Sequence, residues 1–170
     1  MFELNNHKAK LDSVNARAEL HGEERKPAFD LKFTVALGNE CLAFFAPELR
    51  SSLYKKSDAQ GELIDEERES ALRFPKMGRF YWDWEGVGYT LTIPYGIGGI
   101  SDIVVEGINI NKFRLQPQEG GTVLVSFRAI AHLDEKVVGP LCSLIQRETE
   151  ISIEPPPPST VQELFGEQAA

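Results

Sequence analysis

The stretch TVLVSFRAIAHL, residues 122–133, decides the fold class, because its apolar residues recur at every second position. Strands show this alternation when one side of a sheet is buried and the other side faces water. The residues that share the apolar side are Val123, Val125, Phe127, Ala129, Ala131 and Leu133. A sheet with one solvated face is typically antiparallel, so this stretch predicts an antiparallel sheet.

The same period of two recurs along the chain, and turn signals separate the alternating stretches. The further predicted strands are DLKFTVAL (30–37), FYWDW (80–84), YTLTI (89–93) and TEISIE (149–154). The predicted hairpin connections are EGVG (85–88) and QPQEGG (116–121), and Gly107 marks a predicted bulge. Strands this closely spaced favour a sandwich or a barrel over a parallel α/β sheet.

Helical signals are few. The stretch APELRSSLYKK, residues 46–56, has a proline suited to a first helical turn and two lysines suited to the last one. In DEKVVGPLCSLIQRE, residues 134–148, Pro140 predicts that a helix begins only near Gly139. The sequence therefore predicts a mainly β (α+β) fold, an antiparallel sandwich or partly open barrel of about seven strands with two short helices.

The charge of the chain is unevenly distributed. The 170 residues carry a net charge of −8, of which residues 57–70 and residues 148–170 contribute −5 each, so the remainder is +2. We therefore expect one β-rich domain over residues 1–154 with an acidic loop at 57–70, followed by a proline-spaced flexible acidic tail at 155–170. A nearly neutral body leaves an anionic partner such as nucleic acid open.

The remaining composition indicates a protein of the cytoplasm. The start of the chain has no apolar segment after a basic region, and no apolar run approaches the length of a membrane span. Cys41 and Cys142 lie far apart in the sequence and form no CxxC pair, which favours reduced thiols. The alternative is a single disulfide between them.

No combination of residues predicts catalysis. The histidines have no metal-ligand spacing, and the glycines of YGIGGISD, residues 95–102, favour a structural turn over a phosphate loop because no helix signal follows them. Cys142 has helical spacing with Val138 and Ile145, which predicts a buried thiol rather than a nucleophile. We therefore expect no catalytic residue, no metal site and no cofactor.

The segment LRFPKMGRFYWDW, residues 72–84, combines three bases with five aromatic residues. Single-stranded nucleic acid binds where bases stack on aromatic rings along a basic groove. The predicted nucleic-acid-binding residues are Arg73, Lys76, Arg79 and Tyr81, with Lys112, Arg114 and Arg128 on neighbouring strands. The alternative is that Phe80, Trp82 and Trp84 belong to the core, which leaves Tyr81 as the one ring available for stacking.

Two further segments suggest contacts with partners. The charged residues His21, Glu23, Glu24, Arg25 and Lys26 predict a solvated turn, which could also contact a partner. The four prolines at 155–158 form an extended spacer of about 12 Å. Beyond them, a small apolar face for a protein partner is predicted from Val161, Leu164 and Phe165, unless the tail has no role.

The ordered set RAELHGEERKPAFDLKF, LRSSLYKK, GYTLTIPYGIGG and EGGTVLVSFRA resembles a group of small bacteriophage and prophage proteins. That group is associated with early genes near recombination and single-strand-binding genes, and the resemblance covers most of residues 8–153. It implies a bacterial cytoplasmic setting and no defined activity. A β body with a proline-spaced acidic tail is also similar in layout to single-stranded-DNA-binding proteins, although here Phe165 lies five residues from the end.

Together these features predict a non-enzymatic, phage-type binding protein in DNA metabolism whose partner is single-stranded nucleic acid. The alternative is a protein–protein interaction module, or an inhibitor of a host defence or replication factor. In that case the acidic segments would act as the contact or as a mimic of nucleic acid. For either function, the resemblance to phage proteins implies a place in the cytoplasm of a bacterial host.

Overall fold

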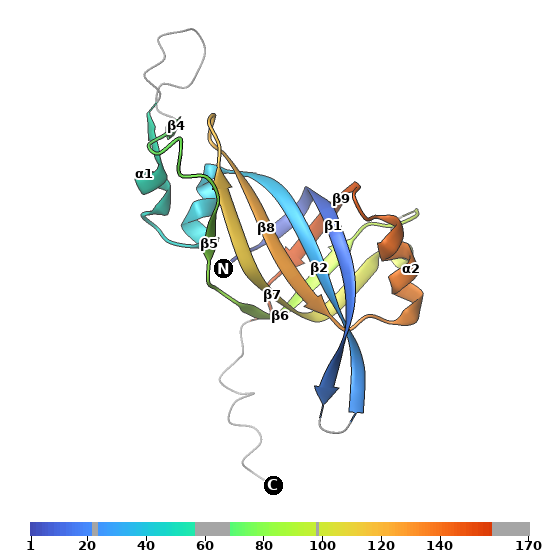
Figure 1. Ribbon diagram of the computed structural model, residues 1–170. Helices are drawn as coiled ribbons and strands as arrows, with labels where there is room; N and C mark the ends of the chain where they lie inside the picture. The colour runs from blue at the N-terminus through green and yellow to red at the C-terminus, as the bar shows by residue number, and fades with distance from the viewer. Residues whose placement is uncertain (22–23, 57–68, 98, 158–170) are drawn as a thin grey trace, which may run out of the picture.

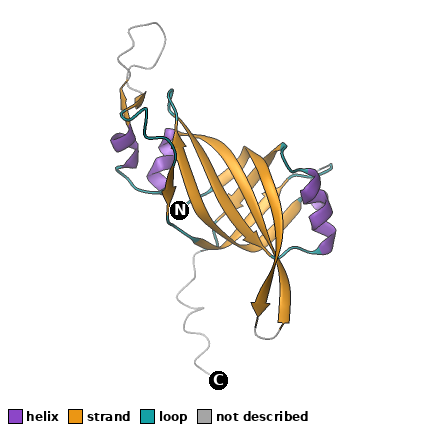
Figure 2. Cartoon of the chain, in the orientation of Figure 1, coloured by secondary structure: helices purple, strands orange, loops and turns teal. Residues whose placement is uncertain are grey.

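The computed structural model describes residues 1–21, 24–56, 69–97 and 99–157. Its main sheet has seven antiparallel strands in the order β5-β7-β6-β9-β1-β2-β8 (Figures 1 and 2). The strands are β1 (Leu4–His21), β2 (Glu24–Gly38), β5 (Phe80–Trp82), β6 (Gly86–Ile93), β7 (Ile103–Pro117), β8 (Thr122–Ala131) and β9 (Glu148–Glu154). A separate pair is formed by β3 (Tyr54–Lys56) and β4 (Glu69–Leu72).

The main sheet closes into a barrel. Strand β7 pairs with β6 along its first half and with β8 along its second half, so six strands form a ring. The short β5 pairs with residues 113–115 of β7 on the edge opposite β8, beyond the end of β6. This confirms the predicted mainly β, antiparallel class. Of the predicted arrangements, the barrel is the one that forms, and its ring is closed rather than partly open because the long β7 reaches two neighbours.

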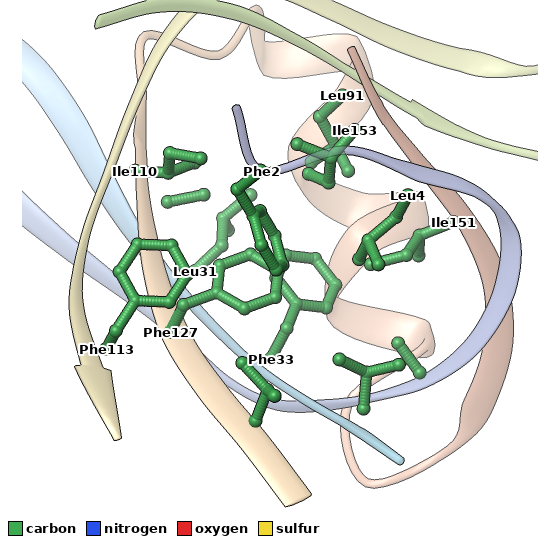
Figure 3. Close-up of a cluster of buried hydrophobic side chains, with 14 of the residues drawn as sticks. Phe2, Leu4, Leu31, Phe33, Leu91, Ile110, Phe113, Phe127, Ile151 and Ile153 are labelled. Carbon is green, nitrogen blue, oxygen red and sulfur yellow. The ribbon is translucent and has the colours of Figure 1, made fainter. Parts of the chain in front are cut away.

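The alternation of β8 is the one predicted from its sequence. Val123, Val125 and Phe127 are at most 2% exposed, whereas the intervening residues are half-buried on the outer face. Inside the barrel the aromatic rings pack edge to face around Phe2, whose ring centroid lies 5.1 Å from that of Phe113 and 5.6 Å from that of Phe127 (Figure 3). The barrel interior is therefore filled by side chains.

Bulges change which residues of the long strands face the core. Gly107 has a φ of 68° and lies where β7 gains a residue relative to β6, which confirms the predicted bulge. The prediction that residues 85–88 form a hairpin connection is wrong. Gly86 begins β6, and the shift of register between Gly86 and Tyr89 places a second bulge at Gly88, whose φ is 78°. Glycine adopts such a positive φ without strain, and bulges use this freedom as turns do.

The helical segments are η1 (Asn39–Phe44), α1 (Leu49–Leu53), η2 (Gly99–Ser101) and α2 (Glu135–Ser143). None of the helices in the described ranges has the length and apolar character needed to cross a membrane. Helix α2 begins at Glu135, so the predicted start near Gly139 is wrong, and Pro140 lies inside the helix. Packing of Val137, Val138 and Leu141 against the core outweighs the hydrogen bond that the proline removes.

The prediction of a buried Cys142 is also wrong. Cys142 is an exposed free thiol on α2, because Leu141 occupies the buried face of the helix and the next residue is rotated by about 100° from it. The buried free thiol is Cys41 in η1, and burial together with the adjacent Glu40 raises its pKa to about 12.

A small unit of η1, α1, β3 and β4 lies at one end of the barrel (Figure 1). The hydroxyl of the buried Tyr54 lies 2.8 Å from the Thr122 carbonyl oxygen and accepts a hydrogen bond from the Gln118 N–H at 3.1 Å. Glu69 and Ser70, predicted within the acidic loop, belong to β4, and the Glu69 carbonyl accepts a 2.6 Å hydrogen bond from the Asn39 side chain. The rest of that predicted loop lies outside the described residues.

The predicted solvated turn from His21 to Lys26 is too long, because residues 24–26 belong to β2, where Arg25 and Lys26 are exposed. Strand β1 runs to His21 and β2 starts at Glu24, with Glu19 opposite Lys26. Their distal halves form a two-stranded ribbon that projects from the barrel (Figure 1).

Candidate nucleic-acid interface

A groove of about 600 Å³ crosses the outer face of the barrel over β1, β2, β8 and β7, next to β5. We call it the outer-face groove. Its polar and charged lining residues are Asp12, Asn15, Asp30, Lys32, Thr34, Arg79, Lys112, Arg114, Gln116, Ser126 and Arg128. Four of the seven predicted nucleic-acid-binding residues therefore line one surface, although they come from three separate segments of the chain.

The outward-facing residues of β2 and β8 form the floor of the groove. On β2 and β8 the residues between the core positions point outward, so Lys32 faces Arg128 and Thr34 faces Ser126 across the two strands. The hydroxyl oxygens of Thr34 and Ser126 lie 2.9 Å apart. The floor is therefore a row of polar groups above the apolar interior.

A third bulge brings Lys112 into the groove. Along β7 the buried positions run Ile108 and Ile110, then Phe113 and Leu115, so the inward phase changes by one residue. The register between β7 and β8 shifts at this point, and Lys112 has a φ of 55°. Without the bulge, alternation would direct Lys112 inward. A non-glycine residue with this φ is strained, and such residues are concentrated at functional sites.

Both carboxylates of the groove are already occupied. Asp30 lies 3.2 Å from the Arg128 guanidinium and 3.1 Å from that of Arg17. Asp12 accepts a 2.6 Å hydrogen bond from the Thr34 hydroxyl and lies 3.6 Å from the Lys10 ammonium. These contacts neutralise the acidic groups of the groove.

Arg128 is held in place by the same network. Its side chain is only 15% exposed, and its Nε donates a 2.9 Å hydrogen bond to the Asn111 side chain. Arg128 therefore supports the groove floor rather than presenting a free charge.

Four cations of the groove have no carboxylate partner within 4.0 Å among the described residues. They are Lys32, Arg79, Lys112 and Arg114, and all four are exposed. Arg79 donates one long hydrogen bond, 3.4 Å, to the Gln116 side chain. An excess of unpaired positive charge thus gathers on one face of a chain whose net charge is −8.

Tyr81 lies beside these cations. Its side chain is 70% exposed, and it is the direct cross-strand partner of Arg114, whose guanidinium carbon lies 5.1 Å from the ring centroid. Phe80, Trp82 and Trp84 instead pack against the core, as the alternative interpretation of this segment expected. Tyr81 is therefore the aromatic ring of β5 that remains open for stacking.

Two predicted residues do not reach the groove. The Arg73 Nε lies 2.9 Å from the backbone oxygens of both Ser51 and Tyr54, where it joins α1 to the segment after β4. Lys76 lies in a separate exposed loop beside Phe74 and Met77.

Sequence reasoning missed Lys32 as a groove residue. The sequence places Lys32 on the polar side of DLKFTVAL, which indicates only that it faces outward. Its place in the groove follows from the pairing of that strand with β8.

Two further predicted segments are the C-terminal tail and the 95–102 turn. The predicted partner-binding residues Val161, Leu164 and Phe165 lie outside the described residues. In the 95–102 turn, the Asp102 carboxylate accepts hydrogen bonds of 3.1 Å from the N–H groups of Tyr95 and Gly99, which is the structural role predicted for this stretch. Within the described ranges no three His, Cys, Asp or Glu side chains gather as metal ligands would.

No protein-family model, curated protein or solved structure matches this chain. Any functional assignment therefore depends on the geometry of the outer-face groove.

Proposed function

We propose that the protein binds single-stranded nucleic acid along the outer-face groove and acts in DNA metabolism without catalysing a reaction. The observation that carries this proposal is the set of four unpaired cations, Lys32, Arg79, Lys112 and Arg114, on one surface of an acidic chain. These four cations suit the phosphate backbone of a nucleic acid, because each contact between a cation and a phosphate releases condensed counterions.

Tyr81 supports a single strand as the partner. Bases are free to stack on a side chain when they are not stacked and paired in a duplex, and one such stack contributes about 1–3 kcal/mol. Arg114 lies against the Tyr81 ring, so one face of the ring is taken by the guanidinium and the remaining exposed surface is available to a base. The same arginine can contact the phosphate that flanks that base.

The polar floor fits a binding role rather than a catalytic one. Asp12 and Asp30 are engaged by neighbouring hydroxyl and guanidinium groups, so neither is presented as a free general base. The Thr34 hydroxyl donates a hydrogen bond to Asp12 and is also hydrogen-bonded to the Ser126 hydroxyl. The two carboxylates instead hold other basic side chains, since Asp30 contacts Arg17 and Arg128 and Asp12 lies near Lys10.

Fluorescence anisotropy with labelled oligonucleotides tests this function. We expect the full chain to bind a single-stranded oligonucleotide at low salt more tightly than a duplex of the same length. Binding of neither would reject the proposal and would favour the alternative of a protein-interaction module. Equal binding of both would show a charged surface without a stacking contribution from Tyr81.

A further inference from the structure

Strand β1 has an open edge from Ser13 to His21. Strand β9 pairs with β1 only over Leu4–Lys10, and the last backbone bonds on that side join Leu11 to the 146–147 segment. Farther along, β2 is the one strand that pairs with β1 among the described residues (Figure 1). Open strand edges present unpaired N–H and C=O groups and can pair with another chain.

Pro27 shows which backbone groups face this edge. It lies directly opposite Ala18, and because proline has no N–H, this pair belongs to the non-hydrogen-bonded set of the ladder. The Pro27 carbonyl oxygen lies 3.2 Å from His132 Nδ1, on the side away from β1. By alternation, the N–H and C=O groups of Ala16, Ala18 and Leu20 point away from β2 toward the open edge.

The two edges of the ribbon differ. On β2 the outer edge carries Pro27, which cannot donate a hydrogen bond, next to the exposed Arg25 and Lys26. Proline and charged residues are the features that prevent edge pairing. The β1 edge presents Ala16, Ala18 and Leu20, and Leu20 is 72% exposed. The ribbon is thus blocked on one edge and open on the other.

We propose that a second copy of this chain pairs with the β1 edge, antiparallel and about a twofold axis at Ala18. In this register Ala18 faces its own copy, and Ala16 faces Leu20 of the partner subunit. On the opposite face Arg17 lies across from Glu19 of the partner subunit, and the symmetry forms this pair twice. Cross-strand pairs of opposite charge and of apolar side chains stabilise a sheet.

Charge selects this register over its neighbours. Symmetric pairing keeps facing residues on the same side of the sheet only when the axis passes through a residue. An axis at Arg17 places two guanidinium groups opposite each other, and an axis at Glu19 places two carboxylates opposite each other. An axis at Ala16 leaves Leu20 against Asp12. The axis at Ala18 avoids these contacts and covers the exposed leucine.

Symmetric cross-linking tests the register, and sedimentation tests the dimer. In the full chain with Cys142→Ser, a cysteine at Ala18 would lie about 5.5 Å, Cα to Cα, from its copy, which a disulfide can bridge. A cysteine at Ala16 would lie about 14 Å from its copy and serves as the matched control. We expect a dimeric mass for the unmodified chain, rapid cross-linking of Ala18→Cys and none of Ala16→Cys.

Proline at position 18 tests the role of the edge. Ala18→Pro removes an N–H that faces away from β2, so the β1–β2 ladder and the circular dichroism spectrum should be retained. We expect this variant to weaken dimerisation by at least about tenfold in Kd, whereas Ala18→Val keeps the dimer. A monomeric mass at every soluble concentration, equal cross-linking of the two cysteine variants, or a dimer unaffected by Ala18→Pro would each overturn the proposal.

Discussion

The guanidinium carbon of Arg114 lies 5.1 Å from the ring centroid of Tyr81, and the two residues are direct partners across β7 and β5. They are 33 positions apart in the sequence, and only the pairing of the short β5 with β7 brings them together. This pair joins the aromatic segment to the basic groove, which is why Tyr81 is the first residue to test.

We expect Tyr81→Ala to weaken single-strand binding by about 1–3 kcal/mol, because one base loses its stacking partner. The variant should unfold at nearly the same urea concentration as the unmodified protein, since Tyr81 is 70% exposed. Trp82→Ala is the matched control on the adjacent inward position. It should cost about 3 kcal/mol of stability, because Trp82 packs against the core near Phe45. An unchanged affinity for Tyr81→Ala would remove the stacking contact from the account.

Two variants of Lys112 distinguish the contribution of its charge to binding from the strain of its backbone. Lys112→Gly and Lys112→Ala both remove the ammonium group, so each should lower the affinity for a single strand and its salt dependence. At a φ of 55° glycine is unstrained and alanine is not, so the glycine variant should be about 1 kcal/mol more stable in urea unfolding. An alanine variant that is as stable as the glycine variant would show that the bulge does not constrain this residue.

Arg73 and Arg79 form a second matched pair. Arg73→Ala removes the side chain that bonds the Ser51 and Tyr54 carbonyls, so we expect a loss of about 1 kcal/mol of stability and unchanged binding. Arg79→Ala should leave stability unchanged. It should make the slope of the logarithm of the association constant against the logarithm of salt concentration shallower, by the amount that corresponds to about one phosphate contact. The reverse pattern, with Arg73→Ala weakening binding, would place the contact at the 73–79 loop.

Stability should fall in alkaline solution. The pKa of Cys41 is raised from 9.0 to about 12 in the folded protein, first by burial and then by Glu40. Between these values the unfolded chain has lost the thiol proton that the folded chain retains. The free energy of unfolding therefore decreases as pH rises through this window, by at most about 1.4 kcal/mol per pH unit from this group. Burial also raises the pKa values of Tyr54 and Tyr89, which adds to the decrease above pH 10.

Urea unfolding between pH 8 and pH 11 measures this dependence, with Cys41→Ala as the control. The control should show a smaller decrease, because only the tyrosines remain. The same protein at neutral pH should react with a maleimide at the exposed Cys142 and not at Cys41. A Cys41→Ala variant with an unchanged pH dependence would contradict the raised pKa.

The strand pattern could be predicted from the sequence, but the closure of the ring could not. Alternation identifies β8 directly, and Gly107 marks one bulge. The bulge between Ile110 and Phe113 was not predicted and is evident only from the pairing of β7 with β8. Closure depends on β7 pairing with both β6 and β8, which no local pattern specifies. For α2, the proline rule was outweighed by packing of the helix against the core.

Part of the groove was predictable because strand alternation shows which residues face outward. Arg79, Lys112, Arg114 and Arg128 were expected on neighbouring strands, and all four line the groove. Arg73 was included because it is close to Arg79 in sequence, yet the chain turns between β4 and β5 and separates them. Lys32 was missed because a single base on the polar side of a strand gains meaning only from its neighbours in the sheet.

The most direct test of the account is the salt dependence of single-strand binding, measured by anisotropy for the unmodified chain and for the variant Lys32→Gln/Arg79→Gln/Lys112→Gln/Arg114→Gln. Four phosphate contacts predict that the logarithm of the association constant falls with the logarithm of salt concentration at a slope of about −3. The variant should bind weakly with a slope near zero and retain its circular dichroism spectrum. Equal slopes for the two proteins, or no binding by the unmodified chain at low salt, would contradict a nucleic-acid interface in this groove.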